Sequence, residues 1–319
     1  MDKRKKQKGD FDMDVIETKG LSKDYGHGRG IFDVTFEVHK GEVYGFLGPN
    51  GAGKSTTMRH LMGFSRPKSG DAYIGGKDCW KDHAAIMKSV GYLPGEVALP
   101  DGLNGVQFLE MMKGLRGGRG ERMQEMIDLF QVNLNGSVKK MSIGEKRKLA
   151  VVAAFMSDPD ILLLDEPTSG LDPVMQEVFI DFVKSEKEKG KTVLLSSHIF
   201  SEVEALCDRI AIIKEGRIVS VTNAEEVKHF KRKTFDITFA DRQNLEKFKQ
   251  TGFEIKEEDS GAQMLSVAAE NPQCDKLIKT LVQFDVVHFV EHNQTLEDYF
   301  MNFYKSDRTF GGIAHGKHH

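Results

Sequence analysis

The sequence has 319 residues, of which 39% are hydrophobic and 29% are charged, and its formal net charge at pH 7 is -3. This composition is typical of a soluble globular chain with room for two domains, and the near-balanced charge argues against a nucleic-acid partner. No apolar run reaches the length of a membrane span, the N-terminus lacks the apolar core of a signal peptide, and the three dispersed cysteines indicate neither a disulfide framework nor a zinc site. We therefore expect a cytoplasmic location.

A basic run opens the chain between Lys3 and Lys8. It has no apolar partners, so we interpret residues 1–14 as a flexible arm, with contact to anionic lipid or RNA as the alternative. From Val15 to Leu47, apolar and polar residues alternate between glycine-rich turns, which predicts an antiparallel β lobe. Within this lobe, Tyr25 offers an aromatic face on which an adenine ring can stack; the alternative is a tyrosine that fills the edge of a core.

A phosphate-binding pattern follows, in which two glycines with four residues between them precede a lysine and a hydroxyl residue. A strand is expected at Val43–Leu47 and a helix at residues 57–64, which is the context that a phosphate loop requires. Glycines let successive backbone N–H groups face a phosphate at a helix N-terminus. The predicted nucleotide-binding residues are Gly48, Pro49, Asn50, Gly51, Ala52, Gly53, Lys54, Ser55 and Thr56.

Helical periodicity dominates residues 82–156, which favours a helical insertion rather than more sheet. Near its end, Ser142 with Glu145 three positions later is a capping-box pattern, so the plain interpretation is a well-started helix. The sharper hypothesis is that this helix N-terminus is directed at a nucleotide.

An acid pair ends the next strand. Residues 161–164 form a uniformly apolar run typical of buried parallel strands, and Asp165 and Glu166 follow it directly. Carboxylates at the carboxyl end of such a strand lie where open α/β sheets bind ligands. Asp165 and the Ser55 hydroxyl are therefore candidate Mg²⁺ ligands, and Glu166 can polarise a water molecule against a γ-phosphate.

A histidine ends a third strand in the same way. The β-rich run Thr192–Leu195 leads through two serines to His198. Three strands that end in a phosphate loop, an acid pair and an imidazole converge on one crevice, so we predict catalytic roles for Lys54, Glu166 and His198. Residues 211–213 and 217–219 are expected to close the sheet as a strand pair.

Beyond a domain boundary at residues 223–226, the pattern changes. Strand and helix signals alternate in the order β-α-β-β-α-β, which predicts a small ferredoxin-like α+β domain at residues 223–305, ending in a helix that opens near Thr295. We interpret the glycine- and histidine-containing residues 306–319 as a flexible tail, with metal binding as the alternative.

Residues 15–222 resemble the nucleotide-binding subunit of an ATP-binding cassette (ABC) transporter. The phosphate loop looks like its Walker A motif and residues 161–166 like Walker B with its catalytic glutamate, while His198 falls at its switch histidine. Residues 169–172 look like the D-loop and residues 142–145 fall at the signature. The resemblance implies a P-loop NTPase fold, ATP with Mg²⁺ as cofactors, and further nucleotide-binding residues Ser142, Gly144 and Asp172.

Two departures from the family pattern stand out. The signature is usually Leu-Ser-Gly-Gly-Gln, and this chain has Ile143 and Glu145 at two of those positions. A glutamine usually follows the proline of the loop after residue 93, where this chain has Gly95 followed by Glu96. Glycine has no side chain to bind Mg²⁺, so the role of Glu96 stays open.

The resemblance also implies a mechanism. Two copies close head to tail, so that each ATP lies between one Walker A loop and the signature of the other copy. A separate membrane permease is then the partner, contacted near residues 93–108, and the chain lies on the inner face of the cell membrane. The C-terminal extension is similar to that of bacterial exporter subunits allied to antibiotic-resistance pumps, as a dimer-contact or regulatory module. The alternatives are a soluble ABC-type ATPase that acts on ribosomes or DNA and a nucleotide-sensing module with little turnover.

Overall fold

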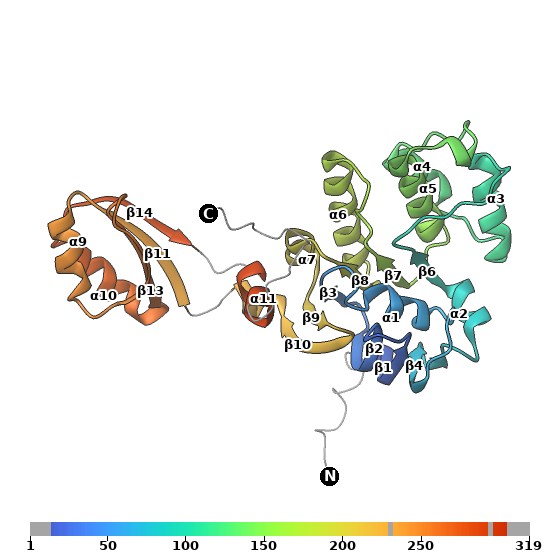
Figure 1. Ribbon diagram of the computed structural model, residues 1–319. Coiled ribbons are helices and arrows are strands. Elements are labelled where there is room, and N and C mark those ends of the chain that lie inside the picture. Colours follow the sequence, from blue (N-terminus) through green and yellow to red (C-terminus); the bar gives the residue numbers. More distant parts are fainter. Residues whose placement is uncertain (1–13, 229–231, 293–295, 305–319) are drawn as a thin grey trace, which may run out of the picture. The chain divides into compact units, whose positions relative to one another are not determined.

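The computed structural model describes residues 14–228, 232–292 and 296–304 (Figure 1). Contacts divide them into two compact units, the first ending at Thr222 and the second beginning at Asn223. Apart from Asp14, the arm at 1–14 and the tail at 306–319 lie outside the described residues. None of the helices in the described ranges is both long and apolar enough to cross a membrane.

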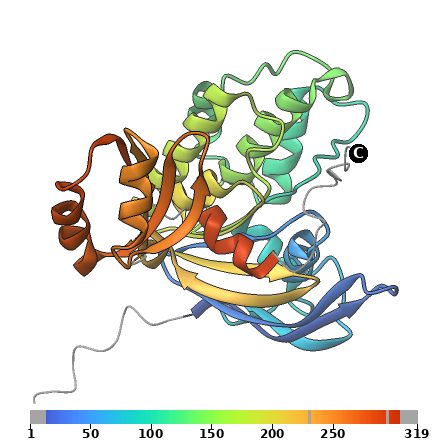
Figure 2. The same ribbon diagram turned by 60° about the vertical axis from the view of Figure 1, so that its left-hand side comes forward.

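The first unit opens with the predicted antiparallel lobe. Strands β1 (Asp14–Asp24) and β2 (Gly30–His39) form a hairpin, drawn in blue in Figure 2. The sheet order is β2-β1-β4-β5, in which β4 (Ser69–Ile74) and β5 (Lys77–Asp78) come from beyond the phosphate loop and were not anticipated. Apolar side chains at alternate positions of β1 and β2 are buried, as the alternation predicts.

A six-stranded sheet forms the centre of this unit, in the order β10-β9-β3-β8-β7-β6. Its parallel pairs are β3 with β8 and β9, and β7 with β6 and β8. Side chains of β7 and β8 are almost fully buried, which explains the apolar runs in the middle of both strands. The strands are β3 (Val43–Leu47), β6 (Val90–Leu93), β7 (Ile161–Asp165), β8 (Thr192–Ser197), β9 (Arg209–Lys214) and β10 (Arg217–Asn223).

The insertion at 82–156 is mainly helical, but the prediction was wrong at β6 (Val90–Leu93), which pairs in parallel with β7. Four residues are too few to show a period, so the surrounding helical pattern hid this strand. The helices α3, α4 and α5 gather on one side of the sheet (Figure 1). The segments here are α2 (His83–Ser89), α3 (Gly105–Leu115), α4 (Met123–Phe130), the 3-10 turn η1 (Val138–Lys140) and α5 (Ile143–Phe155).

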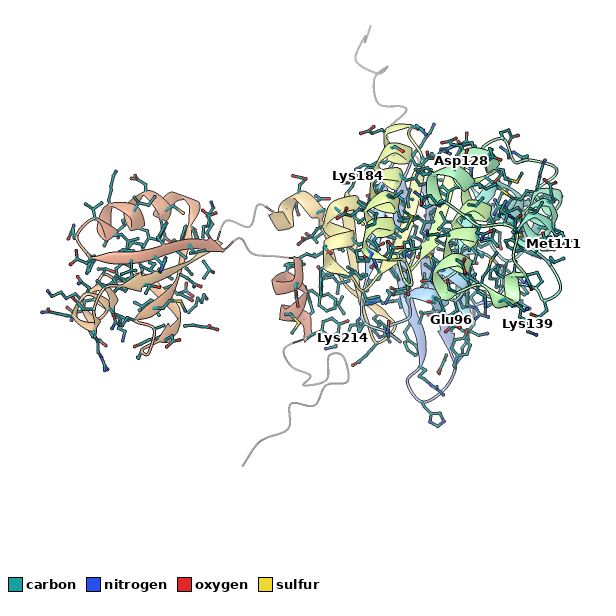
Figure 3. The ribbon with its side chains drawn as sticks, turned by 90° about the horizontal axis from the view of Figure 1, so that it is seen from above. Glu96, Met111, Asp128, Lys139, Lys184 and Lys214 are labelled. Carbon is teal, nitrogen blue, oxygen red and sulfur yellow. The ribbon has the colours of Figure 1, made fainter. Side chains whose placement is uncertain are left out.

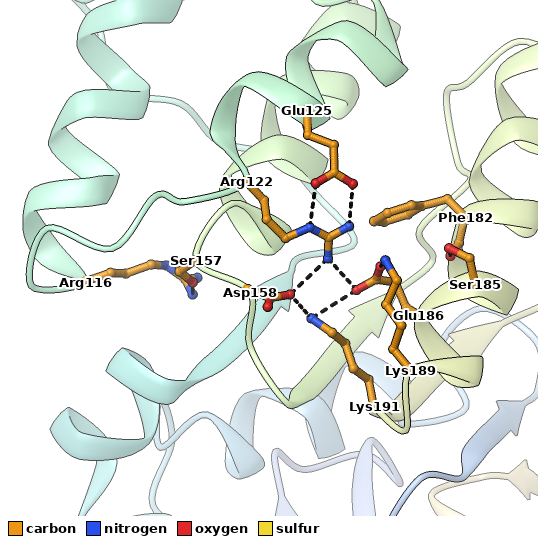
Figure 4. A network of polar contacts seen from close by, with 10 residues as sticks. All are labelled: Arg116, Arg122, Glu125, Ser157, Asp158, Phe182, Ser185, Glu186, Lys189 and Lys191. Carbon is orange, nitrogen blue, oxygen red and sulfur yellow. Dashed lines mark hydrogen bonds and ion pairs between the residues drawn. The ribbon is translucent and has the colours of Figure 1, made fainter.

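Three further helices complete the unit: α1 (Lys54–Leu61), α6 (Pro173–Glu188) and α7 (Phe200–Leu206). A network of charges joins the insertion to α6 (Figure 4). Arg122 Nη1 lies 2.7 Å from Glu186 Oε2 and 3.0 Å from Asp158 Oδ1, and Lys191 Nζ lies 3.0 Å from Glu186 Oε2. Burial alone raises the pKa of Glu186, but hydrogen bonds from Arg122, Lys189 and Lys191 bring that pKa below its usual value. This carboxylate therefore stays charged inside the protein.

The second unit has the predicted β-α-β-β-α-β order and a four-stranded antiparallel sheet in the order β12-β13-β11-β14. Apolar side chains of β11 pack with those of α9 and α10 in one core. Two more helices, α8 and α11, contact each other. The elements are α8 (Ala224–Lys228), β11 (Arg232–Phe239), α9 (Arg242–Lys249), β12 (Glu254–Asp259), β13 (Met264–Glu270), α10 (Asn271–Leu281), β14 (Val286–His292) and α11 (Leu296–Tyr304).

Candidate active site

The phosphate loop joins β3 to α1 through backbone that requires glycine. Gly51 and Gly53 have φ angles of 82° and 112°, in the left-handed region that other residues adopt at a cost. At Gly48, an added Cβ would lie 2.5 Å from the Ile213 carbonyl oxygen, so a side chain there does not fit. Helix α1 begins at Lys54, three residues earlier than the predicted start at residue 57, and this places Ser55 and Thr56 in its first turn. The loop therefore presents backbone N–H groups and two hydroxyls at a helix N-terminus.

Lys54 lies inside this loop with 5% of its surface exposed. Its Nζ donates to the carbonyl oxygens of Gly48, at 2.6 Å, and Pro49, at 3.2 Å. The same Nζ lies 3.0 Å from Oε1 of Glu166. An ammonium held by backbone carbonyls and one carboxylate is a fixed positive charge at the mouth of the loop.

Glu166 connects Lys54 to His198. The Nδ1 atom of His198 lies 2.5 Å from Oε2 of Glu166, so the two carboxylate oxygens contact different residues. The backbone of Glu166 has a φ angle of 48°, a conformation uncommon outside glycine that turns the side chain at the strand end. The sheet order β3-β8-β7 makes the three strand ends neighbours, which is why residues so distant in sequence meet. The three residues predicted to be catalytic thus form one continuous chain of contacts.

Asp165 is 2% exposed and is held by the neighbouring strand. The Ser196 hydroxyl donates to Asp165 Oδ1, and the N–H of Glu166 donates to the Ser196 carbonyl oxygen at 3.0 Å. Gly95 approaches the other oxygen closely, because an added Cβ at Gly95 would lie 3.0 Å from Asp165 Oδ2. The carboxylate of Asp165 and the hydroxyl of Ser55 line the same pocket, and oxygen donors of these two kinds fit a hydrated Mg²⁺.

These residues surround a pocket of about 640 Å³. A smaller cavity of about 280 Å³, which includes His60 and Trp80 in its lining, contains none of the predicted site residues. The large pocket is lined by Pro49, Asn50, Gly51, Gly53, Lys54, Ser55, Thr56, Arg59, Tyr92, Pro94, Gly95, Glu96, Ala98, Asp165, Glu166, Ser169 and His198. Gly48 and Ala52, also predicted, shape the loop from behind without lining the pocket.

Besides Gly48 and Ala52, four more predicted nucleotide-binding residues lie outside this pocket: Tyr25, Ser142, Gly144 and Asp172. Tyr25 is 54% exposed, so the alternative in which it fills the edge of a core is wrong. Lys23 Nζ lies 5.9 Å from the centre of its ring. The ring is exposed enough to stack on a ligand, but it does not line the pocket that contains Lys54.

The start of α5 is the predicted capping box. The Ser142 hydroxyl accepts from the Glu145 N–H at 3.2 Å, and the Glu145 carboxylate accepts from the Ser142 N–H at 2.9 Å. Asp172 caps α6 in a similar way, accepting from the Met175 N–H at 3.0 Å. Within this chain, both side chains are occupied with helix starts rather than with the pocket.

Two buried charged residues next to the site were missed. Arg147 donates to three backbone carbonyls of the pocket loops, and no sequence pattern signals such contacts. Glu202 accepts from the Ser197 hydroxyl at 2.5 Å, directly before His198. Burial raises the pKa of Glu202 to about 7. The sequence signal for Glu202 is its position shortly after His198, in the first turn of α7.

Residues 31–169 match the family model described as ABC transporter. The bacitracin transport ATP-binding protein BcrA of Bacillus licheniformis is 31% identical over 296 residues, which cover 90% of this chain and 96% of that protein. The chain belongs to the ABC transporter family. An uncharacterised ABC transporter ATP-binding protein of Bacillus subtilis, YhcH, is 36% identical over 66% of this chain and 71% of that protein. The daunorubicin/doxorubicin resistance ATP-binding protein DrrA of Streptomyces peucetius is 37% identical over 67% of each chain.

Solved structures agree with this assignment. An ATP-binding subunit of an ABC transporter superposes with a TM-score of 0.62 at 29% identity, over 67% of this chain and 92% of that one. A dimeric cassette, MJ0796, bound to ADP and Pi superposes with a TM-score of 0.58 at 22% identity over 66% of this chain and 98% of that one, a likeness that shows the fold. The chain is thus an ABC ATPase subunit with the expected P-loop fold, and ATP is its nucleotide.

Proposed function

We propose that this ABC subunit hydrolyses ATP in the pocket between its phosphate loop and the Asp165–Glu166 strand end, and that two copies closing around ATP drive export through a separate membrane permease. The contact chain from Lys54 through Glu166 to His198 carries this proposal. It places a fixed positive charge, a candidate base and an orienting imidazole on one side of one pocket.

Each residue has a defined task in the proposed reaction. The Lys54 ammonium binds the outer phosphates and stabilises the negative charge that develops on them. Glu166 polarises the attacking water, and the hydrogen bond between His198 Nδ1 and Glu166 Oε2 fixes the carboxylate that does so. Ser55 and Asp165 would hold Mg²⁺, which would neutralise charge on the phosphates.

The signature residues support the closing of two copies. Ser142 is exposed and lies outside its own pocket, at the N-terminus of a 13-residue helix. Placed against the ATP of a second copy, this helix start adds N–H groups and a favourable dipole. Gly144 approaches the D-loop closely, since an added Cβ would lie 3.0 Å from the Gly170 carbonyl oxygen.

The names of two relatives, which concern bacitracin transport and daunorubicin/doxorubicin resistance, support a membrane permease partner and export. The proposed contact near residues 93–108 adjoins α3, which exposes Val106, Met111 and Leu115 by 46%, 38% and 64% (Met111 is labelled in Figure 3). These exposed apolar side chains offer a docking surface for a helix of such a partner.

The test of hydrolysis compares Glu166→Gln with Glu188→Gln, a control at an exposed position at the end of α6. The wild type and the control should release phosphate from ATP at equal rates. Glu166→Gln should retain ATP binding, lose at least 99% of turnover and form an ATP-dependent dimer on size exclusion. Unchanged turnover in Glu166→Gln would remove this residue from the mechanism, and a wild type without turnover would favour the nucleotide-sensing alternative.

The test of the permease contact uses membranes from cells that express the tagged chain. An integral membrane protein should co-purify with the wild type and with Leu129→Asp, an apolar-to-acid control on α4. It should be lost with Val106→Asp. A chain that never sediments with membranes, or one whose ATPase is stimulated by nucleic acid instead, would contradict transport.

A further inference from the structure

Arg147, in the second turn of α5, is 3% exposed and contacts two separate loops of the pocket. Its Nη1 donates to the Pro94 carbonyl oxygen at 2.6 Å, and its Nη2 donates to the Gly95 carbonyl oxygen. Its Nε donates to the Ser169 carbonyl oxygen at 2.9 Å. One guanidinium therefore links the helix of the signature to the loop after β6 and to the loop after β7.

These contacts are made to backbone rather than to acids. Among the described residues, no carboxylate lies within ion-pair distance of Arg147. Burial lowers the pKa of Arg147, while the more distant charges of Asp165, Glu166 and Glu202 oppose that change. The stability of a buried cation without a paired anion depends on every carbonyl oxygen that it contacts. A movement of either loop should therefore shift Arg147 and the helix α5 that carries it.

The loop after β6 is suited to this kind of contact. Gly95 has no side chain that can reach the pocket, and an added Cβ there would lie 3.0 Å from Asp165 Oδ2. The loop contacts α5 through its backbone. The guanidinium of Arg147 spans two successive carbonyl oxygens of the loop, those of Pro94 and Gly95. The loop is thus coupled to α5 through Arg147 without a contribution from residue 95 beyond its carbonyl oxygen.

We propose that Arg147 is a positioning residue, which makes the location of Ser142 and Gly144 depend on the shape of the nucleotide pocket in the same chain. Pro94, Gly95 and Ser169 line that pocket, and α5 starts four residues before Arg147. Binding of ATP that shifts either loop moves the helix start that faces a second copy. This inference rests on the proposed function, because it assigns the link between ATP binding and pairing of two copies.

The experiment compares Arg147→Met and Arg147→Lys with Arg116→Met. Arg116 is a matched control because it is also buried, at 7% exposure, and donates to Val90 O and Ser157 Oγ away from the pocket. Three quantities are measured for each variant: the Kd of a fluorescent ATP analogue, kcat and KM for ATP, and the protein concentration at which a Glu166→Gln background dimerises with ATP. Hydrogen exchange of residues 142–148 with and without ATP reports on the helix start directly.

Arg147→Met should bind the analogue within threefold of the wild type, because the phosphate loop is intact. Its kcat should fall at least tenfold with little change in KM, its dimerisation should need at least tenfold more protein, and ATP should no longer slow exchange at residues 142–148. Arg147→Lys should be intermediate, because one ammonium cannot bridge two carbonyls and Ser169. Arg116→Met should lower Tm but leave all these quantities within twofold.

Equal kcat, dimerisation and exchange in the Arg147 and Arg116 variants would overturn the proposal. If Arg147→Met does not fold, the folded Arg147→Lys decides the question by the same criteria. A wild type that hydrolyses no ATP would instead defeat the proposed function, which keeps the two failures distinct.

Discussion

His198 Nδ1 lies 2.5 Å from Glu166 Oε2, although the two residues are 32 positions apart in the sequence. Neighbouring parallel strands bring them together, and the second oxygen of the same carboxylate lies 3.0 Å from Lys54 Nζ. The carboxylate is therefore fixed from both sides.

Replacement of the imidazole should leave that carboxylate held by Lys54 alone. We expect His198→Ala to lower kcat roughly 100-fold, in the range typical for loss of a group that assists proton transfer, with KM within threefold. Steady-state ATPase measurements test this, with His288→Ala, at an exposed position on β14, as control. A normal kcat in His198→Ala would show that Glu166 needs no such support.

Removal of magnesium should abolish turnover, and Asp165→Asn should raise the Mg²⁺ concentration needed for half-maximal rate by about tenfold, the order of effect typical for a weakened metal site. The physical reason is the loss of one negative charge beside the Ser55 hydroxyl in the pocket. Titration of ATPase rate with Mg²⁺ after chelation measures the change. An identical titration curve for Asp165→Asn would place the metal elsewhere.

Glu202 should make stability depend on pH. Its folded-state pKa is about 7 against an ordinary value of 4.5, so the protonated form is favoured in the folded chain. The stabilisation is complete below pH 4.5 and is lost as pH rises through 7, an effect on the order of 3 kcal/mol. Denaturant unfolding from pH 5 to pH 8 should show this loss in the wild type and in the Glu188→Gln control. Glu202→Gln should remove this part of the pH dependence of the unfolding free energy. An unchanged pH dependence in Glu202→Gln would show that Glu202 is not its cause.

The Arg122–Glu186 contact should contribute much more to stability than an exposed pair on the same helix. Glu186 is fully buried, and its replacement by glutamine removes the buried carboxylate that Arg122 and Lys191 share and leaves them the half-exposed Asp158. We expect Glu186→Gln to cost about 3–5 kcal/mol, the range for breaking a buried pair. Asp181→Asn, which removes the exposed contact with Lys184 (labelled in Figure 3), should cost about 0–1 kcal/mol.

The stability contributed by Glu186 and its cations should change with pH in the direction opposite to that contributed by Glu202. The pKa of Glu186 is lowered in the folded state, so its stabilisation is present above the unfolded value and is lost as pH falls through the folded one. Unfolding curves of Glu186→Gln should therefore converge with those of the wild type in acid. Curves that stay equally far apart at low pH would show that the charge of Glu186 is not the cause.

The strand ends were predictable because their signal is local. Each of β3, β7 and β8 contains a short apolar run, which leads into the glycine-rich loop after β3 and into polar residues at the ends of β7 and β8, and parallel strands place those ends at one edge. The strand Val90–Leu93 was hidden because its run is too short to stand out from the helices around it. The contacts of Arg147 were not predictable, because its partners are backbone carbonyls. Every residue has one, so the residue types give no sign of which carbonyls Arg147 contacts.

The order of strands in the central sheet also determines when the site can form during synthesis of the chain. A chain released before residue 198 lacks the imidazole and also β9, the strand that pairs with β3 and whose Ile213 lies against the phosphate loop at Gly48. Truncated products of this protein should therefore neither retain nucleotide nor hydrolyse it, and both properties should appear only after the last strands of the sheet have been made.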